Sequence, residues 1–267
     1  MRLQRVTAPY FGYFVAQLRV QFRYRGAAYV QIIAVCLLVA VQAGLWHTVY
    51  ATGHGRGSGL TLHQILVYAV IARIWWQVSP SYGTANLIAT RVRDGSIGPD
   101  LVMPVSLVGG LLSKDLGRAV ANALLIGVPT LVLSLSIIGA PPRPASIART
   151  TLALVIAYFV AFYLSAAVGL LAFVATRIDG FNELRGAFVT LLGGALVPLG
   201  FYPHVLRDIA LASPFVHIYY VPFGLAVGDK TIPGWTSYAG IAWTVALAAI
   251  VFRLANHLRT NFVVQGG

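Results

Sequence analysis

Several apolar stretches in this chain are as long as the hydrocarbon core of a lipid bilayer is thick. About 18 or more consecutive, mostly apolar residues are enough for a helix to cross that core. On this basis we predict six membrane-spanning helices, at residues 28–49, 61–82, 107–138, 148–175, 186–202 and 237–255. Only 10% of the residues are charged, whereas a soluble domain carries roughly 25%. The sequence therefore predicts an all-α integral membrane protein with a single transmembrane domain over residues 1–267, and it excludes a soluble binding module.

The distribution of the basic residues indicates how the chain is oriented. Lysines and arginines collect in the cytoplasmic loops of membrane proteins. When both termini are placed in the cytoplasm, most of the 19 basic residues fall on the cytoplasmic side. We therefore expect a multi-pass protein of the inner or plasma membrane with both termini cytoplasmic. The same rule accounts for the formal net charge of +12. Because no base-reading or base-stacking motif accompanies that charge, we expect no nucleic-acid partner.

An amphipathic stretch, residues 9–25, precedes the first span. Its large apolar residues recur at spacings of three and four, which places them on one face of a helix. That face and its two flanking arginines comprise Phe11, Phe14, Leu18, Phe22, Arg19 and Arg23. Such a helix is typical of the headgroup layer of a leaflet, with its apolar side in the lipid. A frayed basic tail is the alternative, and the apolar arc favours the interfacial helix.

The segment between the fifth and sixth spans, residues 201–235, is apolar but interrupted by prolines. Pro203, Pro214, Pro222 and Pro233 leave no unbroken piece of bilayer length. We predict short helices here that pack on the outer leaflet or re-enter it. An ordinary extracellular loop is the alternative, although such a loop is usually more polar.

Residue patterns that carry catalysis or metal binding are missing from the sequence. The phosphate loop of nucleotide-binding proteins needs G-x-x-x-x-G-K-[ST], and neither Lys114 nor Lys230 lies in that context. The acidic residues fall in loops or near the predicted span ends, while ion-driven carriers usually keep carboxylates within the membrane. The histidines around the first outer loop lack the spacing of metal ligands. We expect no catalytic residue, no metal and no cofactor bound by this chain.

Arg73 lies well inside the second predicted span. An arginine that faces lipid at the bilayer centre costs at least ~2.5 kcal/mol, so this side chain should face protein or water. One interpretation places Arg73 on a substrate path or at a gate. The other makes it a structural residue that binds backbone carbonyls or reaches the interface. The sequence favours neither.

Residues 91–106 form a charged, turn-rich interruption between the second and third spans, on the predicted cytoplasmic side. Asp94, Gly95 and Pro104 prevent a single long helix here. Short amphipathic pieces remain, and their apolar residues include Ile97, Leu101 and Val102. Such a compact projection is suited to binding by a cytosolic partner.

At these residues the sequence resembles the permease subunits of type-2 ATP-binding-cassette exporters. That family has a cytoplasmic pattern of arginine, acid and glycine, followed by an aliphatic turn that ends in Pro-Val-Ser. The matching residues here are Arg91, Arg93, Asp94, Gly95, Ser96, Ile97, Leu101, Met103, Pro104, Val105 and Ser106. Pro99 departs from the leucine-rich helix of the family. A second, outer signature of one branch of the family resembles residues 200–228.

The resemblance implies a permease that works with other chains. Two such permeases, identical or related, would pair within the lipid bilayer, and two separate ATPase subunits that bind ATP and Mg would dock beneath them. The docking elements would be the interfacial helix and the segment 83–106. Within that segment the coupling residues would be Arg91, Arg93, Asp94, Gly95, Ile97, Leu101, Val102 and Pro104. The substrate path would lie at the interface between the permeases, and family members export drugs, antibiotics, lipids or glycan precursors.

A stand-alone membrane protein, such as a lipid-modifying enzyme or a channel, is the alternative function. An enzyme should show His, Asp or Glu residues gathered at one membrane surface. A channel should show polar or charged rings along a pore. Neither pattern is evident in the sequence, which therefore favours the permease.

Overall fold

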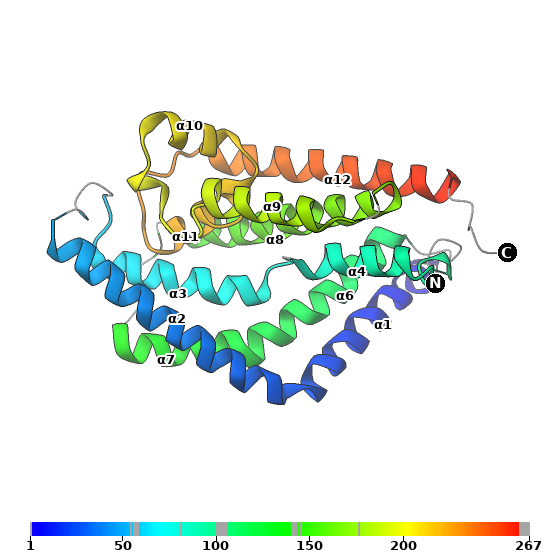
Figure 1. Ribbon diagram of the computed structural model, residues 1–267, viewed down its shortest axis with the longest axis horizontal. Helices are drawn as coiled ribbons and strands as arrows, with labels where there is room; N and C mark the ends of the chain where they lie inside the picture. The colour runs from blue at the N-terminus through cyan, green and yellow to red at the C-terminus, as the bar shows by residue number, and fades with distance from the viewer. Residues whose placement is uncertain are drawn as a thin grey trace.

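Every regular element in the described part of the chain is a helix. The computed structural model describes residues 2–53, 55, 59–80, 82–99, 106–139, 144, 146–175 and 177–261. The α-helices are α1 (Arg2–Arg23), α2 (Arg25–Ala51), α3 (Leu62–Val78), α4 (Tyr82–Arg93), α6 (Leu107–Asn122), α7 (Val128–Ile138), α8 (Ile147–Leu170), α9 (Asp179–Leu192), α10 (His204–Ala212), α11 (Tyr220–Ala226) and α12 (Thr236–Asn261) (Figure 1). Shorter helical turns cover Ala123–Gly127, Leu171–Phe173, Leu199–Phe201 and Phe215–His217. The predicted all-α class is confirmed.

Four helical stretches in the described residues are long and apolar enough to cross a membrane unbroken. They are Arg25–Ala51, Leu107–Ile138, Ile147–Phe173 and Thr236–Leu258. They match the first, third, fourth and sixth predicted spans, which are therefore confirmed in helix length and composition. The second of these stretches joins α6 to α7 through a π-helical turn at Ala123–Gly127, just before Pro129. The proline lacks the N–H that a regular α-helix would use there, which accounts for the local widening.

The second and fifth predicted spans differ from the structure. α3 has 17 residues and stops at Ser79, so residues 61–82 do not form one continuous helix. Pro80 follows, and a residue before proline disfavours the helical conformation. Residues 186–202 are not continuous either, because α9 ends at Leu192 and Gly194 adopts a left-handed conformation with φ of +72°. Glycine reaches that conformation without steric cost, and this turn ends the helix.

The proline-interrupted outer segment contains short helices. α10 and the stretch Phe215–Ala226 meet at 81°, and only together do they have the length and apolar content of a fifth crossing. Both lie at the end of the molecule opposite to the start of α1 and the end of α12 (Figure 1). α11 is a core element, because the Phe223 ring lies edge-on to the rings of Tyr68, Trp75 and Tyr219, with centroids within 5.9 Å.

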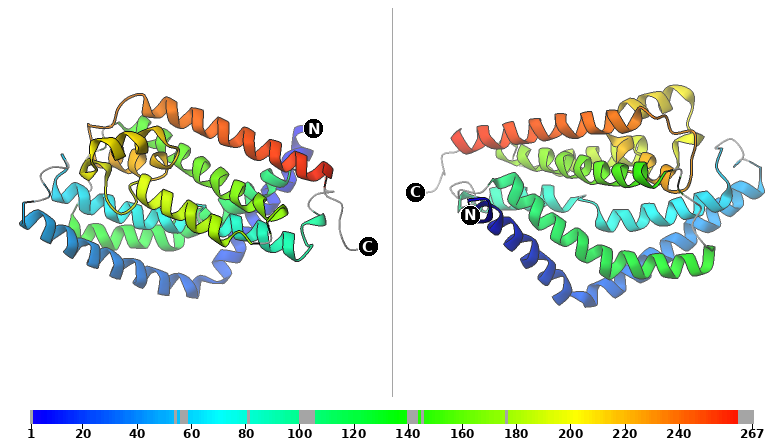
Figure 2. Two further views of the ribbon diagram at one scale, coloured as in Figure 1. Left: turned by 45° about the horizontal axis from the view of Figure 1, so that its top comes forward. Right: turned by 180° about the vertical axis from the view of Figure 1, so that it is seen from behind.

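α8 is the central helix of the molecule. It packs against α4, α11 and α12. α1 and α2 meet at an angle and form a V, beside which α6 and α7 run (Figures 1 and 2). α1 begins and α12 ends at the same end of the molecule, where α4 and the start of α6 also lie (Figure 1). We call this the terminal end.

Candidate coupling and translocation sites

The predicted coupling segment begins with α4, which lies at the terminal end of the molecule (Figure 1). The helix stops at Arg93, and Gly95 turns the chain with φ of +69°. The backbone N–H of Ile97 then donates to the carbonyl of Arg91 at 3.0 Å, which closes the turn. Arg93, Asp94 and Gly95 are exposed, and Arg91 is half-buried. Gly95 thus makes the turn that the sequence predicts, and charged side chains remain open to a partner.

Ile97 differs from the sequence-based expectation. Its side chain is 1% exposed and belongs to the main hydrophobic core of the chain. It therefore anchors the turn to the molecule and does not present an apolar surface to a partner. The other apolar residues of the predicted coupling set, Leu101 and Val102, lie outside the described residues, as does Pro104.

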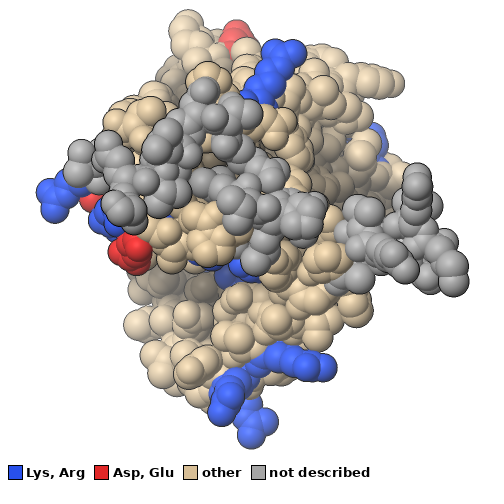
Figure 3. Space-filling view, turned by 90° about the vertical axis from the view of Figure 1, so that its right-hand side faces the viewer, with Lys and Arg blue, Asp and Glu red and all other residues tan. Residues whose placement is uncertain are grey.

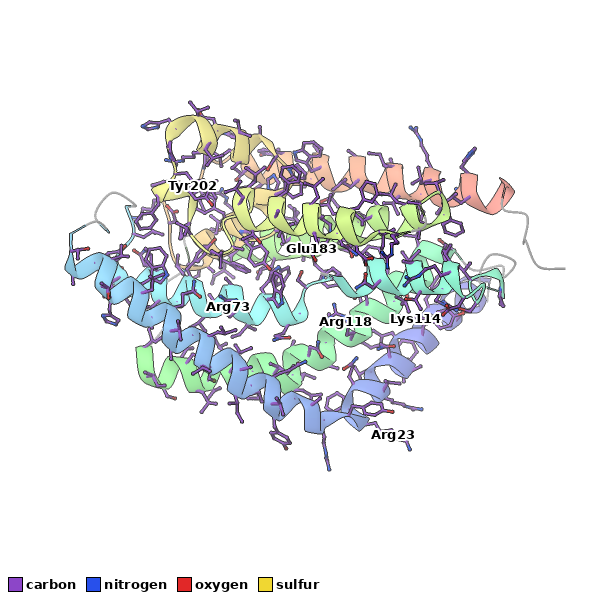
Figure 4. The ribbon with its side chains drawn as sticks, in the orientation of Figure 1. Arg23, Arg73, Lys114, Arg118, Glu183 and Tyr202 are labelled. Carbon is purple, nitrogen blue, oxygen red and sulfur yellow. The ribbon has the colours of Figure 1, made fainter. Side chains whose placement is uncertain are left out.

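A polar joint connects α6 to the place where α3 stops. The last carbonyl groups of a helix have no partner within the helix. The Arg118 side chain of α6 reaches the last carbonyl groups of α3 and the carbonyl of the residue that follows α3. Its guanidinium donates to the carbonyls of Gln77 at 3.2 Å, Val78 at 3.2 Å and Ser79 at 3.0 Å. Figure 4 shows Arg118 between α3 and α6.

Asp115, one turn before Arg118, extends this joint to two further helices. Its Oδ1 lies 2.9 Å from Nη2 of Arg118 and accepts a bond from the Thr84 hydroxyl of α4 at 3.4 Å. Its Oδ2 accepts a bond from the Tyr158 hydroxyl of α8 at 2.5 Å. The carboxylate is buried, with a side chain only 6% exposed. We call Arg118, Asp115, Thr84 and Tyr158 the Arg118 cluster, and it ties α3, α4, α6 and α8 together.

The Arg118 cluster is not predicted from the sequence, in which Asp115 lies near the end of a predicted span and Arg118 is one of the basic residues on the predicted cytoplasmic side. The sequence contains one signal of this cluster. An acid and an arginine three residues apart, Asp115 and Arg118, come after the Ser79-Pro80 pair that breaks a helix. The sequence does not show that these two features meet in space.

α4 packs closely along the second half of α8. A Cβ atom on Gly169 of α8 would lie 2.7 Å from Cδ1 of Ile88 and 3.0 Å from Cα of Ala85. α9 adds a polar contact, since the side-chain amide of Asn182 donates to Asn86 Oδ1 at 2.9 Å. α4 is therefore held on one side by close packing and on the other by the Arg118 cluster.

A helix is present at the predicted interfacial segment, but the prediction covers residues 9–25, whereas α1 spans Arg2–Arg23 and packs against α6. The Tyr10 hydroxyl accepts a bond from the Ser106 backbone N–H at 3.0 Å. At Gly117 of α6 the α1 backbone approaches so closely that an added Cβ would overlap the Phe14 carbonyl oxygen. The contact is made by the Phe14 backbone, while the Phe14 ring stacks with that of Phe11 at 6.3 Å.

The remaining residues of the predicted interfacial set are more open. Phe11 and Phe22 are exposed, as are Arg19 and Arg23, and Leu18 is half-buried. An exposed face that combines phenylalanines with arginines is compatible with a headgroup layer. The position of α1 relative to lipid stays a prediction.

Arg73 faces protein and a cleft. The side chain is half-buried, and its Nε donates to Gln42 Oε1 of α2 at 3.4 Å. Gln42 in turn donates to the carbonyl of Leu196 at 3.5 Å. The cleft beside Arg73 measures about 190 Å³ and is lined by α3, by Thr190 of α9 and by the chain that follows α9. Figure 4 shows Arg73 on the part of α3 nearest to α2. This placement leaves both interpretations of its role open.

The terminal end carries many basic side chains. Figure 3 shows lysine and arginine side chains around this face, with fewer acidic ones between them. Within the described residues there is no group of three or more His, Cys, Asp or Glu side chains that could hold a metal ion.

Comparison with known proteins identifies a family. A family model described as ABC-2 family transporter protein matches residues 28–265, a range that includes most of α2, all of the helices from α3 to α12, and the Arg118 cluster. Neither a curated protein nor a solved structure matches the chain. Because the family model covers most of the sequence, the chain belongs to the ABC-2 transporter family and is a membrane permease subunit of that type.

Proposed function

We propose that this permease exports hydrophobic or amphiphilic compounds and is driven by separate ATPase subunits that bind the exposed tip of α4. The Arg118 cluster is the observation that carries the proposal. It links α4 to the end of α3 and to the middle of α6 and α8, so a displacement of α4 would be passed to those helices. ATP and Mg would bind to two partner ATPase chains, since this sequence has no phosphate loop.

The coupling would be mechanical. A partner that binds the exposed side chains of Arg93 and Asp94 would move α4 as a rigid body, because Ala85 and Ile88 pack this helix closely against α8. The Arg118 cluster would pass that motion to the end of α3, whose last carbonyls it binds. Small shifts of packed helices are a common way of converting a local push into a change between two global states.

The translocation path would run along α2, α3 and α9 beside Arg73. A second permease chain, identical or related, would cover this face within the bilayer. The exposed apolar side chains there include Leu38, Val41, Leu45, Phe188 and Leu191. An apolar face with one arginine and one glutamine suits a substrate that is apolar over most of its surface and carries a polar or anionic group.

The test of coupling uses an exchange of charges. We expect Arg93→Asp with Asp94→Arg to weaken binding of the ATPase about tenfold and to lower export accordingly. Each exposed ion pair is worth ~0.2–1 kcal/mol, and a reversed pair adds repulsion. The net charge of the chain does not change. Co-purification of the ATPase and export from cells measure the two effects.

The matched control is the same exchange at Arg207 and Asp208, an identical dipeptide in α10 at the opposite end. It should leave both readouts unchanged. The purified permease alone should hydrolyse no ATP. Normal export by the α4 exchange variant, or robust hydrolysis by the lone chain after contaminating ATPases are excluded, would contradict the proposal.

A further inference from the structure

Arg73 carries a positive charge for which the described part of the chain supplies no acidic partner. The buried acids in that part of the chain are Asp115 and Asp229. Asp115 pairs with Arg118, and Asp229 accepts bonds from the backbone and the hydroxyl of Thr231. Neither carboxylate therefore balances the charge of Arg73.

The hydrogen bond that Arg73 makes to α2 is neutral and weak. Its Nε donates to Gln42 Oε1 at 3.4 Å, and the Gln42 amide donates to the Leu196 carbonyl at 3.5 Å. Both distances exceed the usual range of about 2.7–3.2 Å for such bonds. Gln42 lies well inside α2, a helix long and apolar enough to cross a membrane. An arginine at that depth is costly unless it is paired, so an anion that reaches Arg73 would be stabilised there.

The cleft beside Arg73 gives an anion access to the guanidinium. It measures about 190 Å³, and its lining includes Ala72, Thr190 and Leu196. Thr190 adds a hydroxyl group, and Leu196 is 48% exposed, so the cleft opens at the surface. Pockets that enclose a drug-sized molecule measure ~300–1,000 Å³. This cleft has room for a small head group, and the rest of such a ligand would lie outside it.

The surroundings of the cleft select the class of ligand. A guanidinium binds carboxylate and phosphate groups through paired hydrogen bonds. Leu38 and Leu45 lie one helical turn on either side of Gln42, and both are exposed, so an apolar tail could cover them. We propose, building on the function proposed above, that the exported compound is an amphiphile whose small anionic head binds Arg73 in this cleft and supplies the missing counter-charge. Gln42 is uncharged, so it holds the guanidinium beside the cleft without competing for that charge.

The binding of matched eight-carbon probes tests the proposal. The full chain in phosphatidylcholine nanodiscs is titrated with octyl phosphate, octanol and octylamine, and binding to empty nanodiscs is subtracted. We expect octyl phosphate to bind about tenfold more tightly than the other two, the effect of one hydrogen bond to a charged group. Inorganic phosphate should compete weakly with octyl phosphate. If it competes as well as octyl phosphate itself, the cleft is a free-anion site and the proposal is wrong. Equal binding of octyl phosphate and octanol would also overturn it.

A near-isosteric change at Gln42 separates charge from shape. In Gln42→Glu the chain supplies its own counter-charge to Arg73, so the preference for octyl phosphate should disappear. Gln31→Glu is the matched control, because it makes the same change at an exposed position of α2 that does not line the cleft. It should keep the preference. The same preference in both variants would contradict the proposal.

Variants of Arg73 check the location of the anion. Arg73→Lys keeps the positive charge and should retain a reduced preference for octyl phosphate, whereas Arg73→Met should abolish it. An undiminished preference in Arg73→Met would place the anion elsewhere and overturn the proposal.

The binding test is independent of coupling to the ATPase. The probes bind without an ATPase, so a failure of the charge exchange at Arg93 and Asp94 leaves this measurement unaffected. Export that continues while octyl phosphate shows no preference would overturn the anionic head alone. A normal preference without any export would support the anion site and contradict the proposed transport.

Discussion

Arg118 illustrates why a charged residue is placed near the end of a membrane helix. α3 stops before Pro80 and leaves carbonyl groups with no partner of their own. A buried polar group without a partner costs about 1–3 kcal/mol, and Arg118 satisfies three of them with one side chain. Asp115 then neutralises the guanidinium. The ion pair therefore serves the fold at a point where the chain must break a helix.

Removal of the Arg118 guanidinium should destabilise the protein. In Arg118→Met the buried Asp115 loses its counter-ion and the carbonyls of Val78 and Ser79 lose the Arg118 donor, whereas Gln77 keeps a bond from Asn122. We expect a loss of about 3 kcal/mol, the lower end of the range for breaking a buried pair, because the Arg118 side chain is 23% exposed. A lower melting temperature of the detergent-solubilised protein would measure it. Arg253→Met, an exposed position on α12, is the control, and equal melting of both variants would contradict the structural role.

Arg73 should affect transport more than assembly. The cleft beside Arg73 is open. In the described structure, the hydrogen bond that joins the Arg73 side chain to Gln42 of α2 is long, at 3.4 Å. We expect Arg73→Ala to reduce export or change substrate preference while the protein is produced at a normal level. Export assays and the yield of purified protein check this. A fall in yield or stability instead would indicate a structural arginine, and unchanged export at normal yield would remove Arg73 from the path.

At the scale of elements, α1 and α6 are packed through small residues. Gly109, Ser113 and Gly117 recur every four residues on α6, a spacing that lets two helix backbones approach closely. Tyr10 and Phe14 of α1 occupy the space that larger side chains would need. The same contact holds the α1 backbone against α6.

Gly117→Ala should displace α1 from α6. The added methyl group would overlap the backbone oxygen of Phe14, which cannot move without the helix. Gly110→Ala in the same helix is the matched control, because its methyl group would rest 3.5 Å from the Tyr13 ring, an ordinary contact. We expect faster proteolysis within α1 and a lower melting temperature for Gly117→Ala alone. Similar behaviour of the two variants would mean that this close approach does not hold α1.

At the scale of the whole molecule, α1 begins and α12 ends at one end, while α10 and α11 lie at the other (Figure 1). Basic side chains surround the terminal end (Figure 3). The positive-inside rule assigns such an end to the cytoplasm. The tip of α4 would then lie at the inner surface.

Cysteine labelling tests this orientation. Cys36 is the single native cysteine and is replaced first. A cysteine at Ser96, in the exposed turn after α4, should react with a membrane-impermeant reagent only after the cells are opened. A cysteine at His204, exposed at the start of α10, should react in intact cells. The reverse pattern would invert the orientation and remove the basis for ATPase docking at α4.

Much of the architecture follows from the sequence, because few backbone structures are stable in lipid. A backbone in hydrocarbon must satisfy its own hydrogen bonds, so long apolar stretches become helices. Prolines and glycines mark where those helices stop, as Gly95 does after α4 and Pro80 after α3. The motif around residues 91–106 and the outer signature were also enough to indicate the family that the family model supports.

The tertiary structure alone decided what each residue contacts. Residue patterns mark Ile97 as apolar but not the neighbours that it meets, and its side chain lies in the core of the chain itself. The Arg118 cluster also depends on the tertiary structure, because its members come from α4, α6 and α8 and the carbonyls that Arg118 binds lie at the end of α3. The apolar length of a helix is a local property, so it can be found from the sequence and predicts that these helices lie in a membrane. The packing of helices that are distant in sequence decides which polar groups meet where a helix breaks. Only the folded chain determines that packing.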